Sequence, residues 1–477
     1  MSEIARTSLL IEPQTALDEE LFERLQSIPS PNQAIYEQLT PSAKKRAQEK
    51  EWFYSQGMRV NPDLRPDTVD LDELDAHEQG LLDFKDYLLG QNDIDPDIKQ
   101  LYRWKVNELI GSDRMLRAAV PTARGAVDKK RFNAYNEFLY GRPDEEIFRS
   151  TASWFRGIAE QALAHESPDV QETAREIMVM LQDIPEGDKQ LIPDEEVFKA
   201  IREQHFKEGG YYSLLLAGVE LPEKSSIKPD AGEPAIAQML KNVGAADYTR
   251  VMTKGAGWSV ANGRKELMGP STYNMPLRRF IGLPLGHEGG SHILEYINGS
   301  RSKVRLLSTG LDRYENGNEG RAVIREQVPY DTMDAFSKIL RWQDIMRRHL
   351  AISLASGLAG ENMNFAKTYA VINTIDRLWE RNKSPDDIKA ADQKAHNRTY
   401  NLLERIFRGT DGGDGGVYLK DMVYLEGNIR AWETAETEPE LIEQGDLGKF
   451  NINRERNGER RHVKVLRRLG VLTVANA

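Results

Sequence analysis

Two histidines five positions apart, with a glutamate directly after the first, are the residues of this 477-residue chain best suited to chemistry. They are His287, Glu288 and His292, in the segment HEGGSH. Imidazole nitrogens are common zinc ligands, and a carboxylate beside a ligand can act as a general base. The segment is one residue longer than the HExxH of many zinc proteases. Of three His-Glu pairs in the chain, only this one has a second histidine close by, so the segment predicts a hydrolytic metal site.

The five-residue spacing places a demand on the helix that carries it. In a regular α-helix, residues five apart lie about 140° apart around the axis, too far for two imidazoles to meet one metal. A π-bulge pairs residue i with residue i+5 and would bring both rings to one face. Gly289 and Gly290 lie inside this turn, and Pro284 and Gly286 weaken the regular ladder upstream. We therefore predict a locally opened helix within the helical segment 275–297.

A third metal ligand must come from elsewhere in the chain. Glu319 is our candidate, because it begins another predicted helix (319–328) and would complete a His₂Glu set with one open position. Spacing alone leaves three rivals, which are Glu295, Glu315 and Glu326.

Five segments in order along the chain resemble the DUF1704 family of QEGLA-motif proteins, which includes MATCAP-like tyrosine carboxypeptidases. HEGGSH followed by NEGRA (318–322) matches its HExGTH-like and QEGLA-like motifs. LYGRP (139–143), FRG (407–409) and LKDMVYLEG (419–427) match further family segments. The chain departs from the pattern at Gly289, Asn318 and Arg321, none of which is a presumed ligand.

The resemblance implies a zincin-like metallopeptidase domain with a Zn²⁺ cofactor. Carried over residue by residue, it implies that His287, His292 and Glu319 bind zinc and that Glu288 is the catalytic base. A zinc-bound water would then be activated by Glu288 and would hydrolyse a C-terminal peptide bond. The enzyme class expected is therefore a zinc metallocarboxypeptidase that acts on a peptide or protein C-terminus.

The charge around the motif favours an anionic substrate. Residues 250–325 contain twelve Lys and Arg but six Asp and Glu, whereas the whole chain has a formal net charge of −11. A carboxypeptidase must bind a terminal carboxylate, for which Arg and Lys are the natural partners, and acidic tails would be favoured further. The candidate substrate-binding residues are Lys254, Arg264, Arg321, Arg408, Tyr314 and Tyr424.

Composition excludes several other functions. Zero Cys removes disulfides, Cys-ligated zinc, iron–sulfur clusters and a cysteine nucleophile. The negative charge argues against nucleic-acid partners, and no apolar stretch is long enough to cross a membrane. With no targeting segment apparent at the N-terminus, we expect a cytoplasmic protein.

The chain reads as α+β, mostly helical, with a small sheet. We expect an N-terminal extension (1–60), a helical domain (61–190), a metallopeptidase domain (191–435) and a charged, peripheral C-terminal tail (436–477). Aromatic and aliphatic residues predict strands at 210–221 and 249–260 and a short strand at 304–307. Three helices are predicted between 331 and 408.

Two other functions compete with the peptidase. A non-heme Fe(II) oxygenase also uses two histidines and a carboxylate, although it needs no base beside the first histidine. The other alternative is a non-catalytic regulatory or peptide-binding protein in which zinc is structural or absent. The open, glycine-rich segment disfavours a closed structural zinc site.

Overall fold

The computed structural model describes residues 7–30, 35–55, 60–120, 128–221, 226–255, 257–338 and 340–473. These residues are mostly helical and include five short strands, so the predicted α+β class is confirmed. In the described part of the chain, no helix has both the length and the apolar character needed to cross a membrane.

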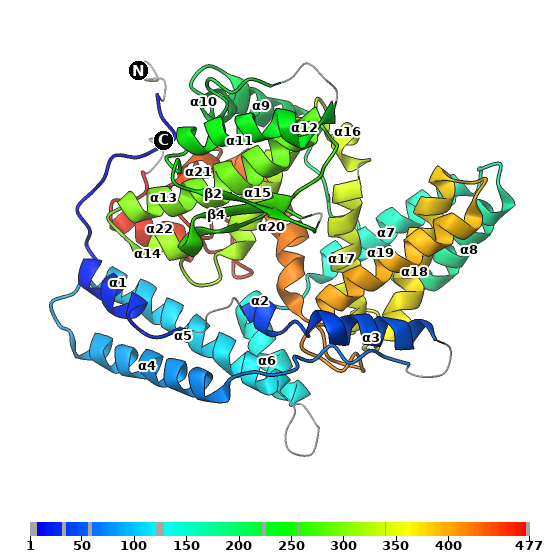
Figure 1. Cartoon of the computed structure of the whole chain (residues 1–477), viewed down its shortest axis with the longest axis horizontal. Coiled ribbons are helices and arrows are strands. Elements are labelled where there is room, and N and C mark those ends of the chain that lie inside the picture. Colours follow the sequence, from blue (N-terminus) through cyan, green and yellow to red (C-terminus); the bar gives the residue numbers. More distant parts are fainter. Residues whose placement is uncertain are drawn as a thin grey trace.

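The first helices lie along one side of the molecule (Figure 1). They are α1 (Glu19–Gln26), α2 (Ile35–Gln38), α3 (Ala43–Tyr54), α4 (Leu71–Gly90), α5 (Pro96–Ala119) and α6 (Lys129–Tyr140). Aspartates fix where three of them begin, because the side chains of Asp70, Asp95 and Asp128 each accept a hydrogen bond from a backbone N–H of the first turn.

A helical arm projects from the body and is built from two distant parts of the chain (Figure 1). It contains α7 (Glu145–Ala162), α8 (Pro168–Leu181), α18 (Phe365–Lys383) and α19 (Ile388–Ile406), and α17 (Leu340–Ala355) runs between the arm and the body. Helices α8 and α18 are in contact, and Arg381 of α18 donates a hydrogen bond to the Thr173 hydroxyl of α8 at 2.9 Å. The three helices predicted between 331 and 408 are present as α17, α18 and α19, and the same range also contains the short helix α16 (Met333–Ser337).

Three helices form the centre of the body: a π-helix, η2 (Ile281–Ile293), and two α-helices, α15 (Glu315–Gln327) and α20 (Val423–Thr437). Helix α15 packs against both of the others. Its approach to α20 is so close that a Cβ on Gly320 would overlap the backbone of Gly427. Asn428 also donates to the Gly320 carbonyl at 3.1 Å, which fixes the position of α15.

Shorter elements surround this centre. They are α9 (Glu195–Phe206), α10 (Tyr211–Leu215), α11 (Pro229–Asn242), α12 (Leu277–Phe280), α13 (Leu294–Arg301), α14 (Leu306–Thr309), α16 (Met333–Ser337), α21 (Glu440–Gln444) and α22 (Arg461–Arg468), with 3₁₀ turns η1 (Asn262–Arg264), η3 (Leu419–Met422) and η4 (Gly445–Leu447). One apolar core runs through elements from Leu9 to Leu472.

The main sheet has three strands in the order β2-β4-β3, namely β2 (Thr249–Thr253), β4 (Glu266–Pro270) and β3 (Ser259–Ala261). Strand β2 is parallel to β4, and β3 is antiparallel to it. The strands predicted at 249–260 are present, but β4 separates them. A second, two-stranded pair joins β1 (Ser226–Ile227) to β5 (Met275–Pro276).

Two predicted strands are wrong. The segment 210–221 contains helix α10, and its Tyr211 and Tyr212 are buried against η2, so their apolar character reflects burial and not pleating. The segment 304–307 leads into helix α14.

The expectation of a peripheral C-terminal tail is also wrong. Leu441, Phe450 and Leu466 are buried in the main core, and the Asp446 carboxylate is bonded to arginines of α15. Some of the charged residues of this segment form buried ion pairs and are not exposed to solvent.

Candidate active site

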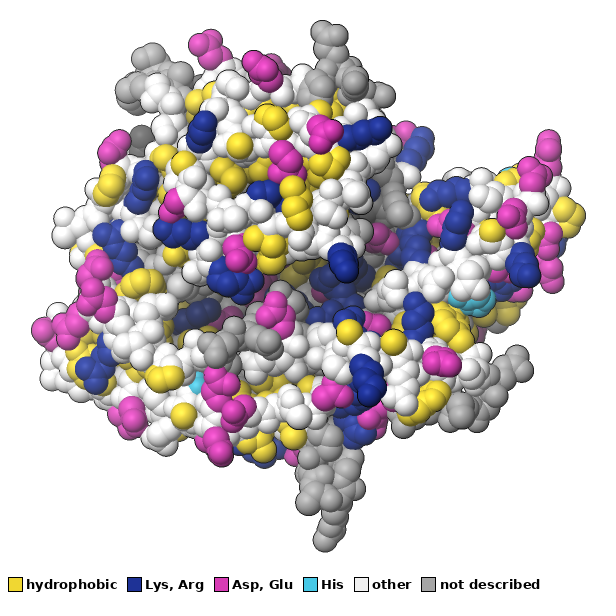
Figure 2. All heavy atoms as spheres, viewed as in Figure 1, with side chains coloured by type: hydrophobic (Ala, Val, Ile, Leu, Met, Phe, Trp, Pro, Cys, Tyr) yellow, Lys and Arg dark blue, Asp and Glu magenta, His cyan; other side chains and the backbone are white. Residues whose placement is uncertain are grey.

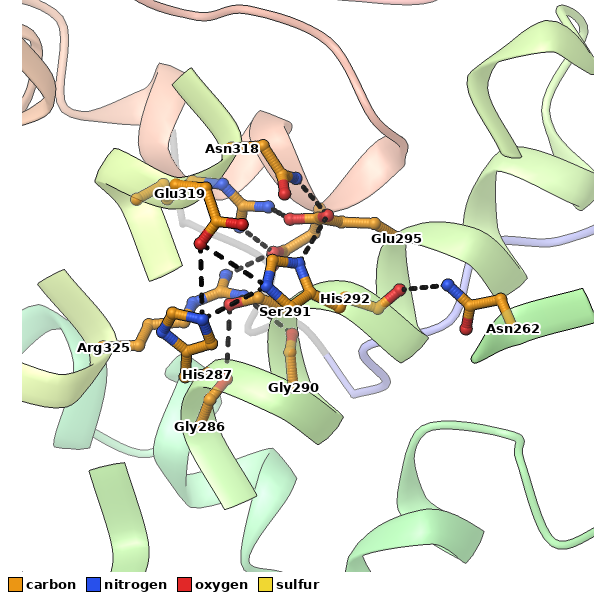
Figure 3. A network of polar contacts seen from close by, with 12 residues as sticks. Asn262, Gly286, His287, Gly290, Ser291, His292, Glu295, Asn318, Glu319 and Arg325 are labelled. Atoms are coloured by element: carbon orange, nitrogen blue, oxygen red, sulfur yellow. Dashed lines mark hydrogen bonds and ion pairs between the residues drawn. The ribbon is translucent and has the colours of Figure 1, made fainter. Parts of the chain in front are cut away.

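The two histidines of the motif lie on one face because their helix is a π-helix over its whole length. Their Nε2 atoms are 3.2 Å apart, and both rings point toward the same space (Figure 3). The Ser291 hydroxyl donates to the Gly286 carbonyl five positions earlier at 3.2 Å, in keeping with the wider turn. The prediction of a locally opened helix is therefore confirmed.

The glycines of the motif allow other helices to approach η2 closely. A Cβ on Gly290 would overlap the hydroxyl of Tyr211 on α10, and a Cβ on Gly289 would overlap the sulfur of Met239 on α11. The Tyr211 hydroxyl donates to the Gly286 carbonyl at 3.0 Å and thereby holds α10 against the π-helix. The glycines of the motif therefore make room for α10 and α11.

Helix α15 brings Glu319 to the two histidines. Its Oε2 lies 3.5 Å from Nε2 of His287 and 3.8 Å from Nε2 of His292. A tetrahedral metal with bonds of about 2.0–2.1 Å would hold its ligand atoms roughly 3.3 Å apart, close to these separations. The Glu319 oxygen is buried and accepts no hydrogen bond from a described residue. These three residues form the one His/Cys/Asp/Glu group with metal-binding spacing that the described residues contain.

The rival carboxylates have other partners. The Oε1 atom of Glu326 lies 2.7 Å from Nδ1 of His287, on the side of the ring away from the cluster. Glu295 accepts from Asn318 and pairs with Arg321, and its Oε2 is 4.0 Å from Nδ1 of His292. Glu326 therefore contacts His287 from outside the cluster, as carboxylates commonly do at metal sites, whereas Glu295 is too far from His292 for a hydrogen bond. Glu315 lies 3.9 Å from Lys420.

Burial and the mutual interactions of the three groups shift their pKa values. Burial lowers the pKa of His287, but Glu326 and Glu319 outweigh burial and raise it to about 10. Burial lowers the pKa of His292 to about 3, and the neighbouring His287 adds to this effect. Burial raises the pKa of Glu319, but the two histidines outweigh it and lower the pKa to about 2. Neutral His292 and ionised Glu319 are the forms that bind a metal.

A cavity of about 400 Å³ opens beside the cluster. Glu288 lines this cavity and is buried, with 6% of the residue exposed. Residues 258–262, at and beside strand β3, form one wall, and residues of the segment 405–424 form another. Figure 2 shows that this face of the molecule is hollowed between the body and the N-terminal helices, with Lys and Arg side chains gathered there.

Three of the six predicted substrate-binding residues line this cavity, namely Arg408, Tyr314 and Tyr424. Lys254 and Arg264 are exposed and do not line it, and Arg264 pairs with Glu266 at 2.8 Å. Arg321 is 1% exposed and is bonded to Glu295 and Asp446. The arginine in the NEGRA segment therefore serves the structure of the site and does not face the cavity.

Sequence reasoning missed three cations of the cavity, Arg405, Lys420 and Lys449. Lys420 lies within the LKDMVYLEG segment and Arg405 lies two positions before the FRG segment, so closer attention to the segments that carried the family resemblance would have found them. No local pattern marks Lys449, which lies in the segment expected to be peripheral.

Part of the chain matches a known protein family. Residues 226–456, just under half of the chain, match the model of a family described as microtubule-associated tyrosine carboxypeptidase. The matched range contains η2, α15 and every residue that lines the cavity. No curated protein matches the chain.

Proposed function

We propose that this protein is a zinc-dependent carboxypeptidase that removes a C-terminal residue from a peptide or protein. The observation that carries the proposal is the convergence of His287, His292 and Glu319 beside a cavity lined by Glu288. The donor types, their separations and the unbonded Glu319 oxygen fit a zinc ion. The match to a family described as a tyrosine carboxypeptidase supports the same reaction and favours a C-terminal tyrosine as the residue released.

Zinc bound at these residues would polarise the scissile carbonyl and lower the pKa of a water from 15.7 toward about 7. Glu288 would accept a proton from the attacking water and pass it to the leaving amine. Tyr314 and Tyr424 line the same cavity, and burial raises the pKa of both hydroxyls, so each stays protonated and can donate. One of them would stabilise the negative charge that develops on the carbonyl oxygen.

Strand β3 offers a way to hold the substrate backbone. It is paired to β4 on one side, and its other edge has no partner strand among the described residues. Ser259 and Val260 of this strand line the cavity. An extended peptide can add to such an edge through main-chain hydrogen bonds, which give affinity without specifying side chains.

The test is to incubate zinc-loaded protein with a peptide library and to identify new C-termini by mass spectrometry. We expect loss of single C-terminal residues, abolished in Glu288→Gln, which preserves the shape of the side chain and removes the base. The matched control is Glu436→Gln, which lies exposed on α20. An active Glu288→Gln protein would overturn the mechanism. Iron rather than zinc in protein purified without added metal would favour an oxygenase.

A further inference from the structure

Lys449 brings an ammonium group into the cavity on the His292 side of the cluster. It lines the cavity, and its positive charge acts on both His292 and Glu319. The Nζ atom lies 5.9 Å from the centre of the Tyr296 ring, on the helix that follows the π-helix.

The backbone around Lys449 is fixed on both sides. Its N–H donates to the Leu307 carbonyl at 2.8 Å, and its carbonyl accepts from the Leu311 N–H at 2.9 Å. Gly448 approaches Leu307 so closely that a Cβ there would lie 2.6 Å from the Leu307 Cβ. These contacts hold the base of the lysine side chain rigidly against the end of α14.

The other cations of the cavity already have protein partners. Arg405 donates to Asp421 at 2.8 Å, and Lys420 lies 3.9 Å from Glu315. The Arg408 guanidinium donates to the Arg405 carbonyl at 2.7 Å. The ammonium of Lys449 has neither a hydrogen bond nor an ion pair with any described residue.

Among the described residues, Lys449 is therefore the cavity cation whose charged group has neither a hydrogen-bond partner nor an ion-pair partner. Burial and the neighbouring charge of Lys105 lower the pKa of Lys449 to about 8, although Glu315 and Glu319 oppose this effect. An ammonium in this position is poorly compensated by the protein, so a ligand carboxylate would gain a charge-assisted hydrogen bond at little cost.

We propose that Lys449 binds the α-carboxylate of the substrate's C-terminal residue and so confines cleavage to the last peptide bond. This inference rests on the proposed carboxypeptidase function. In such a reaction the terminal Cα is only about 3.8 Å from the Cα of the preceding residue, so the cation that binds the carboxylate must lie next to the metal ligands. Lys449 meets this condition, whereas Lys254 and Arg264 do not line the cavity.

The experiment measures binding in the inactive Glu288→Gln protein loaded with zinc. The probes are acetyl-Ala-Ala-Ala-Ala-Tyr with a free C-terminal carboxylate and the same peptide as a C-terminal amide. The dissociation constant of each peptide is measured by calorimetry. We expect the acid to bind at least about tenfold more tightly than the amide, as a charge-assisted hydrogen bond would give. Adding Lys449→Met should remove this preference and leave the bound zinc unchanged, whereas Lys449→Arg should retain most of it.

The control is Lys464→Met, an exposed lysine on α22, which should keep the full preference. A preference for the acid that survives Lys449→Met, or no preference in the parent protein, would overturn the inference. Its failure is distinct from failure of the proposed function, which would appear as no residue released by the protein with Glu288 intact.

Discussion

At the scale of single residues, the two ring nitrogens of each motif histidine have different neighbours. The Nε2 atoms of both histidines face Glu319, and the Nδ1 atoms face Glu326 and Glu295. Glu319 and Glu326 are seven positions apart on α15, which puts them on the same face two turns apart. One helix therefore supplies both a candidate ligand and an acid that contacts another candidate ligand.

Replacing this second acid should weaken metal binding. We expect Glu326→Gln to lower zinc affinity by roughly 10- to 100-fold, because the ring of His287 loses the carboxylate on its Nδ1 side. Competition with a chromophoric chelator measures the change. Glu315→Gln, on the same helix but paired with Lys420, is the control and should leave the affinity unchanged. Equal affinities of all three proteins would show that Glu326 does not act on the metal ligand.

A buried histidine outside the cluster should make stability depend on pH. Burial, helped by the charge of Arg325, lowers the pKa of His205 to about 4. The unfolded chain therefore binds a proton below pH 6.5 that the folded protein does not bind until pH 4, so stability is complete above pH 6.5 and falls as the pH drops through this window.

We expect His205 to account for about 2 kcal/mol of the stability lost between pH 7.5 and pH 5. Urea unfolding at the two pH values should show a smaller loss for His205→Gln than for the unchanged protein. His165→Gln, in the turn between α7 and α8, serves as the control. The same pH dependence in His205→Gln and in the unchanged protein would contradict the assignment.

At the scale of elements, the π-helix is stabilised by the helices that pack on its glycines. The Tyr211 hydroxyl contacts η2 at Gly286 and Gly290, and the Arg325 guanidinium lies 3.7 Å from the centre of the Tyr211 ring. Arg325 in turn donates to the Gly290 carbonyl at 2.7 Å. The unusual helix is therefore bonded to α10 and α15, and the contact with Tyr211 of α10 leaves no room for a Cβ at position 290.

A methyl group at this position should destabilise the protein. We expect Gly290→Ala to lower the free energy of unfolding by about 1–3 kcal/mol, because its Cβ overlaps the Tyr211 hydroxyl. Adding Tyr211→Phe removes that hydroxyl and should recover part of the loss, so the two changes will not be additive in urea unfolding. Gly157→Ala on α7 has open space around its Cβ and should be neutral or slightly stabilising. Additive losses would rule out this contact as the cause.

Sequence spacing predicted the opened helix and offered Glu319 as a candidate ligand, but it could not exclude Glu326 or Glu295. All three acids lie near the histidines, and only the three-dimensional arrangement shows which oxygen faces both Nε2 atoms. The same limit explains the error at 210–221, where tyrosines that pack on glycines resemble the aromatic residues of a strand. The local sequence pattern indicates that a residue is buried more reliably than it indicates which element the residue packs against.

At the scale of the whole molecule, the C-terminal segment is part of the unit that holds the site. The Asp446 carboxylate accepts from Arg321 at 2.5 Å and also from Arg325, both on the helix that carries Glu319. Asn298 on α13 donates to the Asp446 carbonyl at 2.9 Å. These partners lie more than 100 positions away in the chain, which is why composition alone made the segment look peripheral.

Removing this charge should therefore affect both the fold and the metal site. In Asp446→Asn, two buried arginines lose their shared carboxylate, and breaking a buried ion pair in this way typically costs 3–5 kcal/mol. We expect a lower urea midpoint and, because Arg325 is bonded to the π-helix at Gly290, a weaker affinity for zinc. Asp386→Asn, at an exposed position, should change neither quantity. If Asp446→Asn had the same urea midpoint and zinc affinity as the unchanged protein, the C-terminal segment would pack on the site without stabilising it. A decrease in both quantities would show that residues far from the HEGGSH motif maintain the geometry of the candidate ligands.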